Sequence, residues 1–268
     1  MLKPKNNFKV VTDKKTARVI LPNMLTLIGV CIGLTSIRFA LDGRFEFAIV
    51  AIILAAVIDG LDGRIARLIK GTSKVGKELD SLTDMISFGV APAFIMYFWK
   101  LNTLGRFGWL VCLIYVICVA LRLARFNVNS SQIPSWKDNF FDGVPSPAGG
   151  ILVLTPLIFS MTNFEFITIN YDIVVPIFFI ATSFLLISKF PSYSFKKIVI
   201  QRKTTIFLLF GIVLFFGLLL IYPFNLIAVS AIVYLAILPI SFFHYQKLKK
   251  QNEDQNFKDE DDDLEDIL

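Results

Sequence analysis

Long runs of apolar residues alternate with short polar segments along most of the chain, from Leu21 to Phe243. Such runs are typical of helices that cross a bilayer, because about 20 residues span its hydrocarbon core. The pattern predicts eight membrane spans, at residues 22–41, 45–58, 82–99, 107–125, 147–163, 173–190, 205–221 and 223–243. Apolar and polar residues do not alternate inside these runs, so the pattern does not fit a transmembrane β-barrel.

The composition agrees with this pattern. Of the 268 residues, 55% are hydrophobic and 18% are charged, and 27 are phenylalanine. The mean hydropathy is +0.67. Soluble domains have about 45–50% apolar and about 25% charged residues, so a soluble globule, a disordered chain and a secreted disulfide scaffold are all disfavoured. We therefore expect an all-α integral membrane protein with about eight transmembrane helices.

Lysine and arginine mark alternate connections between the spans. The basic segments are the N-terminus and residues 60–78, 122–142, 189–203 and 244–250. The connections between them have few basic residues: Asp42–Glu46, Lys100–Arg106, Asn163–Tyr171 and Tyr222–Asn225. Basic connections face the cytoplasm, so the pattern predicts a multi-pass protein of the cell membrane with both termini in the cytoplasm.

The net charge of +6 is unevenly distributed. Residues 251–268 contain one lysine and nine acidic residues, which leaves a charge of +14 on the rest of the chain. We expect residues 1–20 to form a basic cytoplasmic segment and residues 246–268 to form an acidic, disordered cytoplasmic tail. The basic residues are spread over several connections and are not gathered with exposed aromatic residues, so no nucleic-acid partner is expected.

Cysteine and histidine offer little chemistry. Cys31, Cys112 and Cys118 all lie inside apolar spans with no CxxC pair, and His244 is the single histidine. Neither a zinc site nor a disulfide framework is supported, and His244 is better explained as an interfacial residue than as part of a catalytic triad. The chemistry is therefore expected to use carboxylates, arginine, lysine and hydroxyl groups.

Four aspartates flank the basic segment between the second and third spans. Asp59 and Asp62 are three residues apart, and Asp80 and Asp84 are four apart. On helices each pair lies on one face, one turn apart, and a short loop lets the two pairs face each other at the cytoplasmic boundary of the membrane. Their charges match two divalent cations, and oxygen-rich sites suit Mg²⁺ or Mn²⁺. Two such ions about 3.5–4 Å apart can hold the attacking and leaving oxygens of a phosphoryl transfer.

Residues beside the aspartates suit a phosphate ligand. Gly63 has no side chain and lets a ligand approach closely, and Arg67 offers a bidentate fork for phosphate one turn later. The simpler alternative is that the aspartates cap helices and form interfacial salt bridges around a tight loop. That alternative suits any single aspartate better than it suits all four at this spacing.

The segment resembles the signature of the CDP-alcohol phosphatidyltransferases at every fixed position. The matching residues are Asp59, Asp62, Gly63, Ala66, Arg67, Gly76, Asp80 and Asp84. The resemblance implies a membrane enzyme that transfers a phosphatidyl group from a CDP-linked lipid to an alcohol and releases CMP. It also implies a family core at residues 21–190, two additional transmembrane helices at residues 191–245, and a homodimer.

Four flanking segments are similar to those of the bacterial, membrane-embedded members that use L-serine as acceptor. They are residues 22–30, 55–93, 120–128 and 140–150. This resemblance implies CDP-diacylglycerol and L-serine as substrates. It also implies that Asp59, Asp62, Asp80 and Asp84 ligate the metals and that Asp84 acts as general base. The residues implied to hold CDP-diacylglycerol are Asn23, Thr26, Gly63, Arg67 and Ser73.

The acceptor is less closely defined by the residues themselves. Arg122, Arg125 and Asn127, at the cytoplasmic end of the fourth span, could bind a carboxylate or a phosphate, or could anchor the helix at the membrane surface. Glycerol phosphate, inositol, inositol phosphate and choline therefore remain alternative acceptors.

A more distant alternative is an ion-coupled transporter, because intramembrane carboxylates often mark ion paths. The absence of an internal repeat in the sequence and the position of the acids at one end of the spans disfavour a transporter. The last two spans, at residues 205–243, carry no evident functional polar group, and we expect them to face lipid or another subunit.

Overall fold

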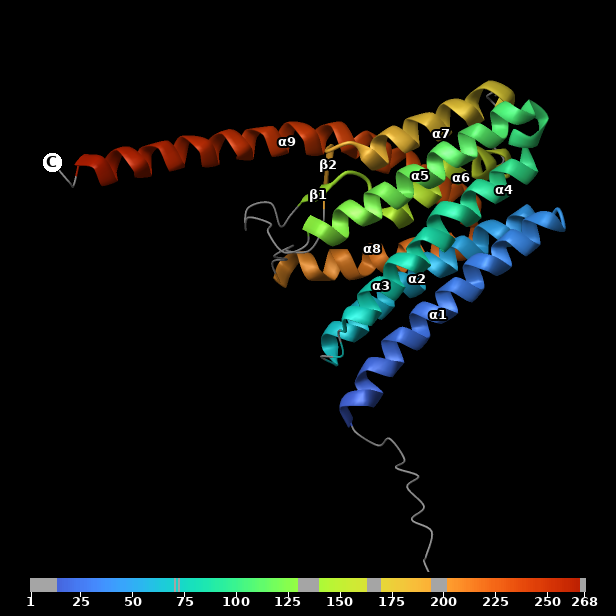
Figure 1. Ribbon diagram of the computed structural model, residues 1–268, viewed down its shortest axis with the longest axis horizontal. Coiled ribbons are helices and arrows are strands. Elements are labelled where there is room, and N and C mark those ends of the chain that lie inside the picture. The colour runs from blue at the N-terminus through green and yellow to red at the C-terminus, as the bar shows by residue number, and fades with distance from the viewer. Residues whose placement is uncertain are drawn as a thin grey trace, which may run out of the picture.

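The computed structural model describes residues 14–69, 71, 73–129, 140–162, 170–193 and 202–265. Over these ranges the chain forms a bundle of helices with one short two-stranded ribbon (Figure 1). In chain order, the elements are α1 (Lys14–Leu41), α2 (Phe45–Leu68), α3 (Lys74–Asp84), the π-helix η1 (Met85–Val90), α4 (Ala91–Trp99), the 3-10 helix η2 (Leu101–Leu104), α5 (Arg106–Asn129), β1 (Phe140–Asp142), α6 (Ser146–Ser160), α7 (Tyr171–Ile187), β2 (Pro191–Tyr193), α8 (Arg202–Ile221) and α9 (Pro223–Glu265).

Each of the eight predicted spans contains a helix. Among the described residues, four helical stretches are long and apolar enough to cross a membrane: Ile20–Leu41, Lys74–Trp99, Arg106–Val128 and Pro223–Gln251. Three shorter apolar helices are Ser146–Ser160, Tyr171–Ile187 and Leu209–Ile221. The remaining span lies in α2, which is apolar in its first half and carries charged residues in its second. The protein is an all-α integral membrane protein, as the sequence predicts.

Helices α2 and α3 extend beyond the apolar runs that predicted them. The second run ends at Ile58, but α2 continues to Leu68, and α3 begins at Lys74 although the third run begins at residue 82. Hydropathy marks only the part of a helix that lies in hydrocarbon, whereas backbone hydrogen bonds continue to form in the polar residues beyond it. These polar extensions carry three of the four motif aspartates, and the fourth, Asp84, ends α3.

The connections between helices fall at two opposite ends of the bundle (Figure 1). Helices α1 and α2, and α4 and α5, are joined at one end, where α6 also ends and α7 begins. The α2–α3 turn, the β1–β2 ribbon and the first residues of α1 and α8 lie at the other end, toward which α9 returns. Both ends of the described chain therefore lie on the side of the α2–α3 turn, as an even number of spans requires.

Small residues on α1 let it pack closely against α3 and η1. A Cβ atom on Gly33 would lie 2.5 Å from the Oγ of Ser87. The Ser87 hydroxyl donates a hydrogen bond to the carbonyl of Gly29, 3.3 Å away. Close approach of small residues is a common means of helix association in membranes. Here it fixes α1 beside the helix that carries the second pair of aspartates.

The π-helix η1 follows Asp84 directly, and it is not predicted by the hydropathy pattern. Its Phe88 is fully buried, and the buried hydroxyl of Tyr115 in α5 donates to the Phe88 carbonyl at 2.7 Å. The Tyr115 ring packs edge-on against Phe179 of α7, with ring centroids 5.4 Å apart. Single π-helical turns occur frequently at functional sites, and this one connects the site-bearing helix to the core of the bundle.

The ribbon formed by β1 and β2 was also not predicted. The strands are antiparallel, with Phe140 opposite Tyr193. Gly143 follows β1 with a φ of 83°, and a Cβ atom there would lie 2.9 Å from the Ser188 carbonyl oxygen. Glycine alone accepts that φ without strain and leaves room for that contact. The ribbon thereby holds the start of α6 beside the end of α7.

Helix α9 corrects the prediction that residues 205–243 face only lipid or another subunit. One face of α9 packs against α6 and β2. The residues buried on it include Ala228, Ala231, Leu238 and the polar Ser241. Helix α9 therefore belongs to the interior packing of the chain, although other apolar residues on it, such as Val229 and Ile240, are exposed.

The two terminal segments are described only in part. Residues 1–13 of the predicted basic segment lie outside the described residues, and α1 begins at Lys14. The acidic segment was predicted to be disordered, but α9 continues through it to Glu265. Helical backbone therefore extends well beyond the last apolar residue of the eighth span.

Candidate active site

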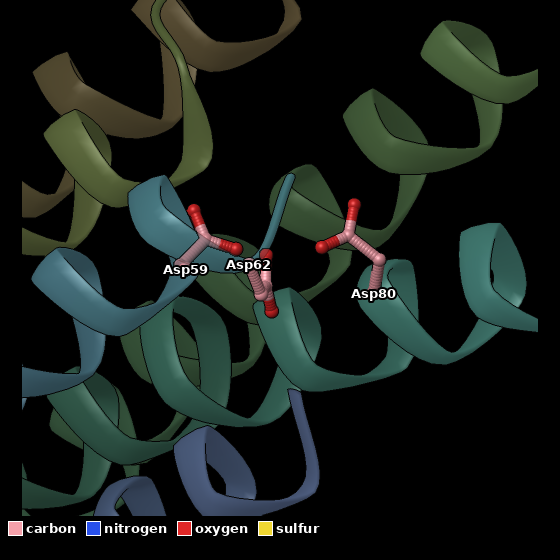
Figure 2. A group of neighbouring side chains, drawn as sticks. All are labelled: Asp59, Asp62 and Asp80. Carbon is pink, nitrogen blue, oxygen red and sulfur yellow. The ribbon is translucent and has the colours of Figure 1, made fainter. Parts of the chain in front are cut away.

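Three of the four motif aspartates converge. Asp59 and Asp62 lie one turn apart near the end of α2. Asp80 lies on α3, and α3 faces the end of α2 across the short turn. One carboxylate oxygen from each lies within 4.8 Å of the others. Figure 2 shows the carboxyl groups of the three residues turned toward the same space. The structure thus confirms the predicted convergence of the two helix ends for these residues.

Asp84 lies beside this cluster, at the last position of α3. Its carboxyl group is repelled by the charges of Asp59 and Asp80 and attracted by that of Arg122 on α5. The Oδ1 atom of Asp84 is buried and has no hydrogen-bond partner among the described residues. A buried acceptor of this kind is costly unless a positive group or a proton satisfies it.

The donor set fits divalent metal ions. Carboxylate oxygens are the ligands that hard cations such as Mg²⁺ and Mn²⁺ prefer. Four carboxylates in one place repel one another, and the buried Oδ1 of Asp84 adds an acceptor that protein donors leave unsatisfied. Cations placed among these oxygens would relieve both costs, so the residues present could hold metal ions.

A pocket of about 240 Å³ opens beside the aspartates between α1, α2 and α3. All five residues predicted to hold CDP-diacylglycerol line it. Its lining consists of Pro22, Asn23, Thr26, Asp62, Gly63, Ala66, Arg67, Gly71, Ser73, Gly76, Lys77 and Asp80. The pocket and the acidic cluster therefore share Asp62 and Asp80, and they form one continuous site.

The turn between α2 and α3 is held in place by contacts within the pocket wall. Ser73 is the N-cap of α3, and its hydroxyl accepts a hydrogen bond from the Gly76 backbone N–H at 2.9 Å. A Cβ atom on Gly76 would lie 2.8 Å from the Oδ1 of Asn23 on α1. The motif glycine thus lets α1 approach the first turn of α3, which keeps Asn23 in the pocket wall.

Thr26 links α1 directly to the acidic cluster. Its hydroxyl donates to the Oδ2 of Asp62 at 2.8 Å, and the carbonyl of Pro22 lies 3.0 Å from the same hydroxyl. Both Thr26 and Asp62 are buried. The predicted role of Thr26 was substrate binding, and the structure adds a hydrogen bond that fixes the orientation of an aspartate.

The three predicted acceptor residues make contacts with different elements. Arg125 donates to the carbonyl of Ile187 at 2.6 Å, and the Asn127 amide donates to the Ser81 hydroxyl at 2.9 Å. These contacts tie the end of α5 to α7 and α3. Arg122 is different, because it interacts electrostatically with Asp84. Arg122 therefore interacts directly with a residue of the acidic cluster.

Two polar residues near Arg122 are not marked by any motif in the sequence. The guanidinium of Arg122 donates to the hydroxyl of Ser146, which is fully buried at the start of α6. Tyr234 of α9 is close enough to Arg122 to interact with it electrostatically. Ser146 lies in the segment 140–150, which the sequence marks only by its similarity to the serine-using family members. Tyr234 lies in an apolar run in which nothing marks it as internal.

The fold and the site together define an integral membrane protein with an acidic, metal-compatible cluster beside a polar pocket. Residues 19–242 match the family model described as CDP-alcohol phosphatidyltransferase. The chain belongs to this family. The match includes α9 up to residue 242, and so extends past the core predicted at residues 21–190.

Several curated relatives share one name, CDP-diacylglycerol–serine O-phosphatidyltransferase. The protein of Mycobacterium leprae is 36% identical over 254 residues, which cover 91% of this chain and 82% of that protein. The protein of Helicobacter pylori strain 26695 is 34% identical over 81% of this chain and 88% of its own length. The Bacillus subtilis protein is 34% identical over 66% of this chain and 92% of its own length.

Proposed function

We propose that this chain transfers the phosphatidyl group of CDP-diacylglycerol to the hydroxyl group of L-serine, giving phosphatidylserine and CMP. The observation that carries the proposal is the convergence of carboxylates from α2 and α3 at the edge of a pocket lined by the motif residues. The shared name of the relatives supports serine as the acceptor.

The pocket suits the polar headgroup of a CDP-linked lipid. Asn23 and Ser73 present amide and hydroxyl groups, and Arg67 presents a guanidinium that can bind phosphate through two hydrogen bonds. Gly63 follows Asp62 on α2 and lies one turn before Arg67. A Cβ atom placed on Gly63 would have nothing within 4 Å, so the surface of α2 is open there. The lipid chains would extend into the bilayer from this polar end.

Asp59, Asp62, Asp80 and Asp84 are the residues that would hold two divalent ions, Mg²⁺ or Mn²⁺. When bound, such ions neutralise the pyrophosphate and the negative charge that develops on the leaving phosphate. The protein contributes the placement: two helix ends hold carboxylates rigidly, and the Thr26 hydroxyl orients Asp62.

Asp84 is the proposed general base. Its carboxylate takes the proton of the serine hydroxyl, and the serine oxygen forms a bond to the phosphorus that carries diacylglycerol. The bond between that phosphorus and the CMP oxygen breaks, and its electron pair leaves with CMP. The buried, unpartnered Oδ1 of Asp84 supports this role, because it offers a free lone pair away from bulk water.

Arg122 is the proposed ligand of the serine carboxylate. Its interaction with Asp84 places a positive group close to the proposed base, and its Nε–H is buried without a hydrogen-bond partner among the described residues. Arg125 and Asn127 already hold other elements in place, so their proposed role is structural.

Thr26→Val tests the link between α1 and the acidic cluster. Valine keeps the shape of threonine but loses the hydrogen bond to Asp62. Loss of a group that orients a metal ligand costs about 10- to 100-fold in metal affinity or activity. We expect the Mg²⁺ concentration for half-maximal CMP release to rise about 10-fold or more.

The matched control is Thr35→Val, on the same helix. Thr35 is exposed, and its hydroxyl donates to the carbonyl of Cys31 within α1. This variant should keep the Mg²⁺ dependence of the wild type. Equal behaviour of the two variants would show that the Thr26 hydroxyl does not support the cluster.

An acceptor panel tests the proposed reaction itself. The purified protein is given CDP-diacylglycerol with Mg²⁺ or Mn²⁺ and, separately, L-serine, glycerol 3-phosphate, inositol, inositol phosphate or choline. We expect CMP release that depends on L-serine and yields phosphatidylserine. Faster release with another alcohol would reassign the acceptor. Uptake of a solute into vesicles without CMP release would support the transporter alternative.

We further propose that the protein resides in the cell membrane with the site and both termini on the cytoplasmic side. The alternation of basic connections supports this orientation, as does the position of the chain ends and the α2–α3 turn at one end of the bundle (Figure 1). A homodimer, and a division into a core at residues 21–190 and two added helices at residues 191–245, remain part of the same proposal.

A further inference from the structure

Helix α9 brings a polar side chain to the interior of the bundle near Arg122. Tyr234 occupies the same helical face as Ala231, Leu238 and Ser241, all of which are buried. This face packs against α6 and β2. Arg122 is bound to the first residue of α6 through the Ser146 hydroxyl. Tyr234 and Arg122 are close enough to interact electrostatically.

Both side chains carry a buried donor without an acceptor. The Tyr234 hydroxyl and the Arg122 Nε–H have no hydrogen-bond partner within the part of the chain that the structure describes. Ser192 is close enough to the Tyr234 hydroxyl to interact with it, and the Ser192 hydroxyl donates its proton to the Gly143 carbonyl at 3.0 Å. Buried polar groups are nearly always hydrogen-bonded, so two unsatisfied donors in one cluster are complementary to a group that brings acceptors.

We propose that Tyr234 and Arg122 together bind the carboxylate of the acceptor amino acid, with the tyrosine O–H donating to one oxygen and the arginine Nε–H to the other. This inference rests on the proposed function and names a residue outside the predicted core. A carboxylate fits because it carries two acceptor oxygens and a negative charge. A choline ammonium would be repelled by Arg122 and would leave both donors unsatisfied.

The position of Asp84 supports the same arrangement. Its charge interacts with that of Arg122, so a serine held by its carboxylate at Arg122 lies with its hydroxyl near the proposed base. Tyr234 would then be a specificity residue contributed by the second of the two added helices. Helix α9 would then serve to select the acceptor as well as to occupy the membrane.

Tyr234→Phe tests the inference, because it removes one hydroxyl and keeps the ring. A hydrogen bond to a charged group contributes enough that its loss weakens binding about 10-fold or more. We expect the KM for L-serine to rise by about this factor while the KM for CDP-diacylglycerol stays unchanged. The matched control is Tyr222→Phe at the α8–α9 connection, where the tyrosine is 56% exposed; both of its KM values should equal those of the wild type.

L-Serinamide provides a second measurement, because a neutral amide replaces its carboxylate. The wild type should prefer serine strongly, and Tyr234→Phe should lower the ratio of kcat/KM for serine to that for serinamide about 10-fold. An unchanged KM for serine would overturn the inference, as would a rise in both KM values with the preference for serine retained. If the wild type released no CMP in response to serine, the proposed function itself would be wrong. That result is measured on the wild type alone and is therefore distinct from a failure of the inference about Tyr234.

Discussion

Asp84→Asn is expected to lower serine-dependent CMP release by about 10³-fold or more. Asparagine has nearly the same shape as aspartate, but its amide cannot take the proton of the serine hydroxyl and is a weaker metal ligand. The substitution also removes a buried charge that Asp59 and Asp80 repel, so the folded protein should be at least as stable as the wild type in the absence of metal. CMP release in detergent micelles and the Tm of the same sample measure the two effects.

The control for this variant is Asp42→Asn, which makes the same chemical change at the opposite end of the bundle. Asp42 forms an exposed ion pair with Arg38 at 3.2 Å, and such surface pairs contribute little to stability. Its activity and Tm should match those of the wild type. Retention of CMP release by Asp84→Asn within about tenfold of the wild-type rate would remove Asp84 as the general base, because that role alone is worth about 10²–10⁴-fold.

Chelation of divalent cations is expected to abolish CMP release, and excess Mg²⁺ or Mn²⁺ should restore it. The reason is the acidic cluster: carboxylate oxygens of Asp59, Asp62 and Asp80 converge within 4.8 Å, with no ion to offset their repulsion after chelation. Binding of a ligand to the folded state alone adds about 2.7 kcal/mol of stability at 100 times its Kd. Mg²⁺ should therefore also raise the Tm, which can be measured without substrate.

A double variant, Asp59→Asn with Asp80→Asn, tests whether Mg²⁺ acts by binding at the acidic cluster or elsewhere on the protein. It should lose both the activity and the rise in Tm caused by Mg²⁺. The control is Asp172→Asn, whose aspartate pairs with Lys100 at 3.0 Å far from the cluster along the chain; it should keep both. Full activity in the presence of chelator would contradict a metal-dependent mechanism, whatever the Tm shows.

Much of the fold could be predicted from hydropathy alone. A helix that crosses a membrane must be apolar over most of its length, and each of the eight apolar runs contains a helix. The same signal could not show the polar extension of α2 to Leu68 or the start of α3 at Lys74, because those residues lie beyond the hydrocarbon. It could not show η1 either, since Met85–Val90 lies within a continuous apolar run that is equally compatible with an α-helix.

The part of the site that depends on the spacing of residues along one helix could be predicted from the sequence. Residues three or four apart share a helix face however the helices pack. The spacing therefore predicts that Asp59 lies beside Asp62 and that Asp80 lies beside Asp84. The pattern also suggested that the pairs meet, and the short turn with Ser73 as N-cap makes this possible. The place of Tyr234 could not be predicted, because the partner of a helix face in an apolar bundle is decided by tertiary packing.

The π-helix between Asp84 and Ala91 changes the direction in which side chains point on α4 relative to α3. A π-turn contains one more residue than an α-turn, and each residue advances a helix by about 100°. Before η1, Asp80 and Asp84 are aimed at the end of α2; after it, Ala91 and Ile95 are fully buried in the bundle. Deletion of one residue from Met85–Val90 would restore a regular helix and turn either the carboxylates or the buried face away by about a quarter of a revolution.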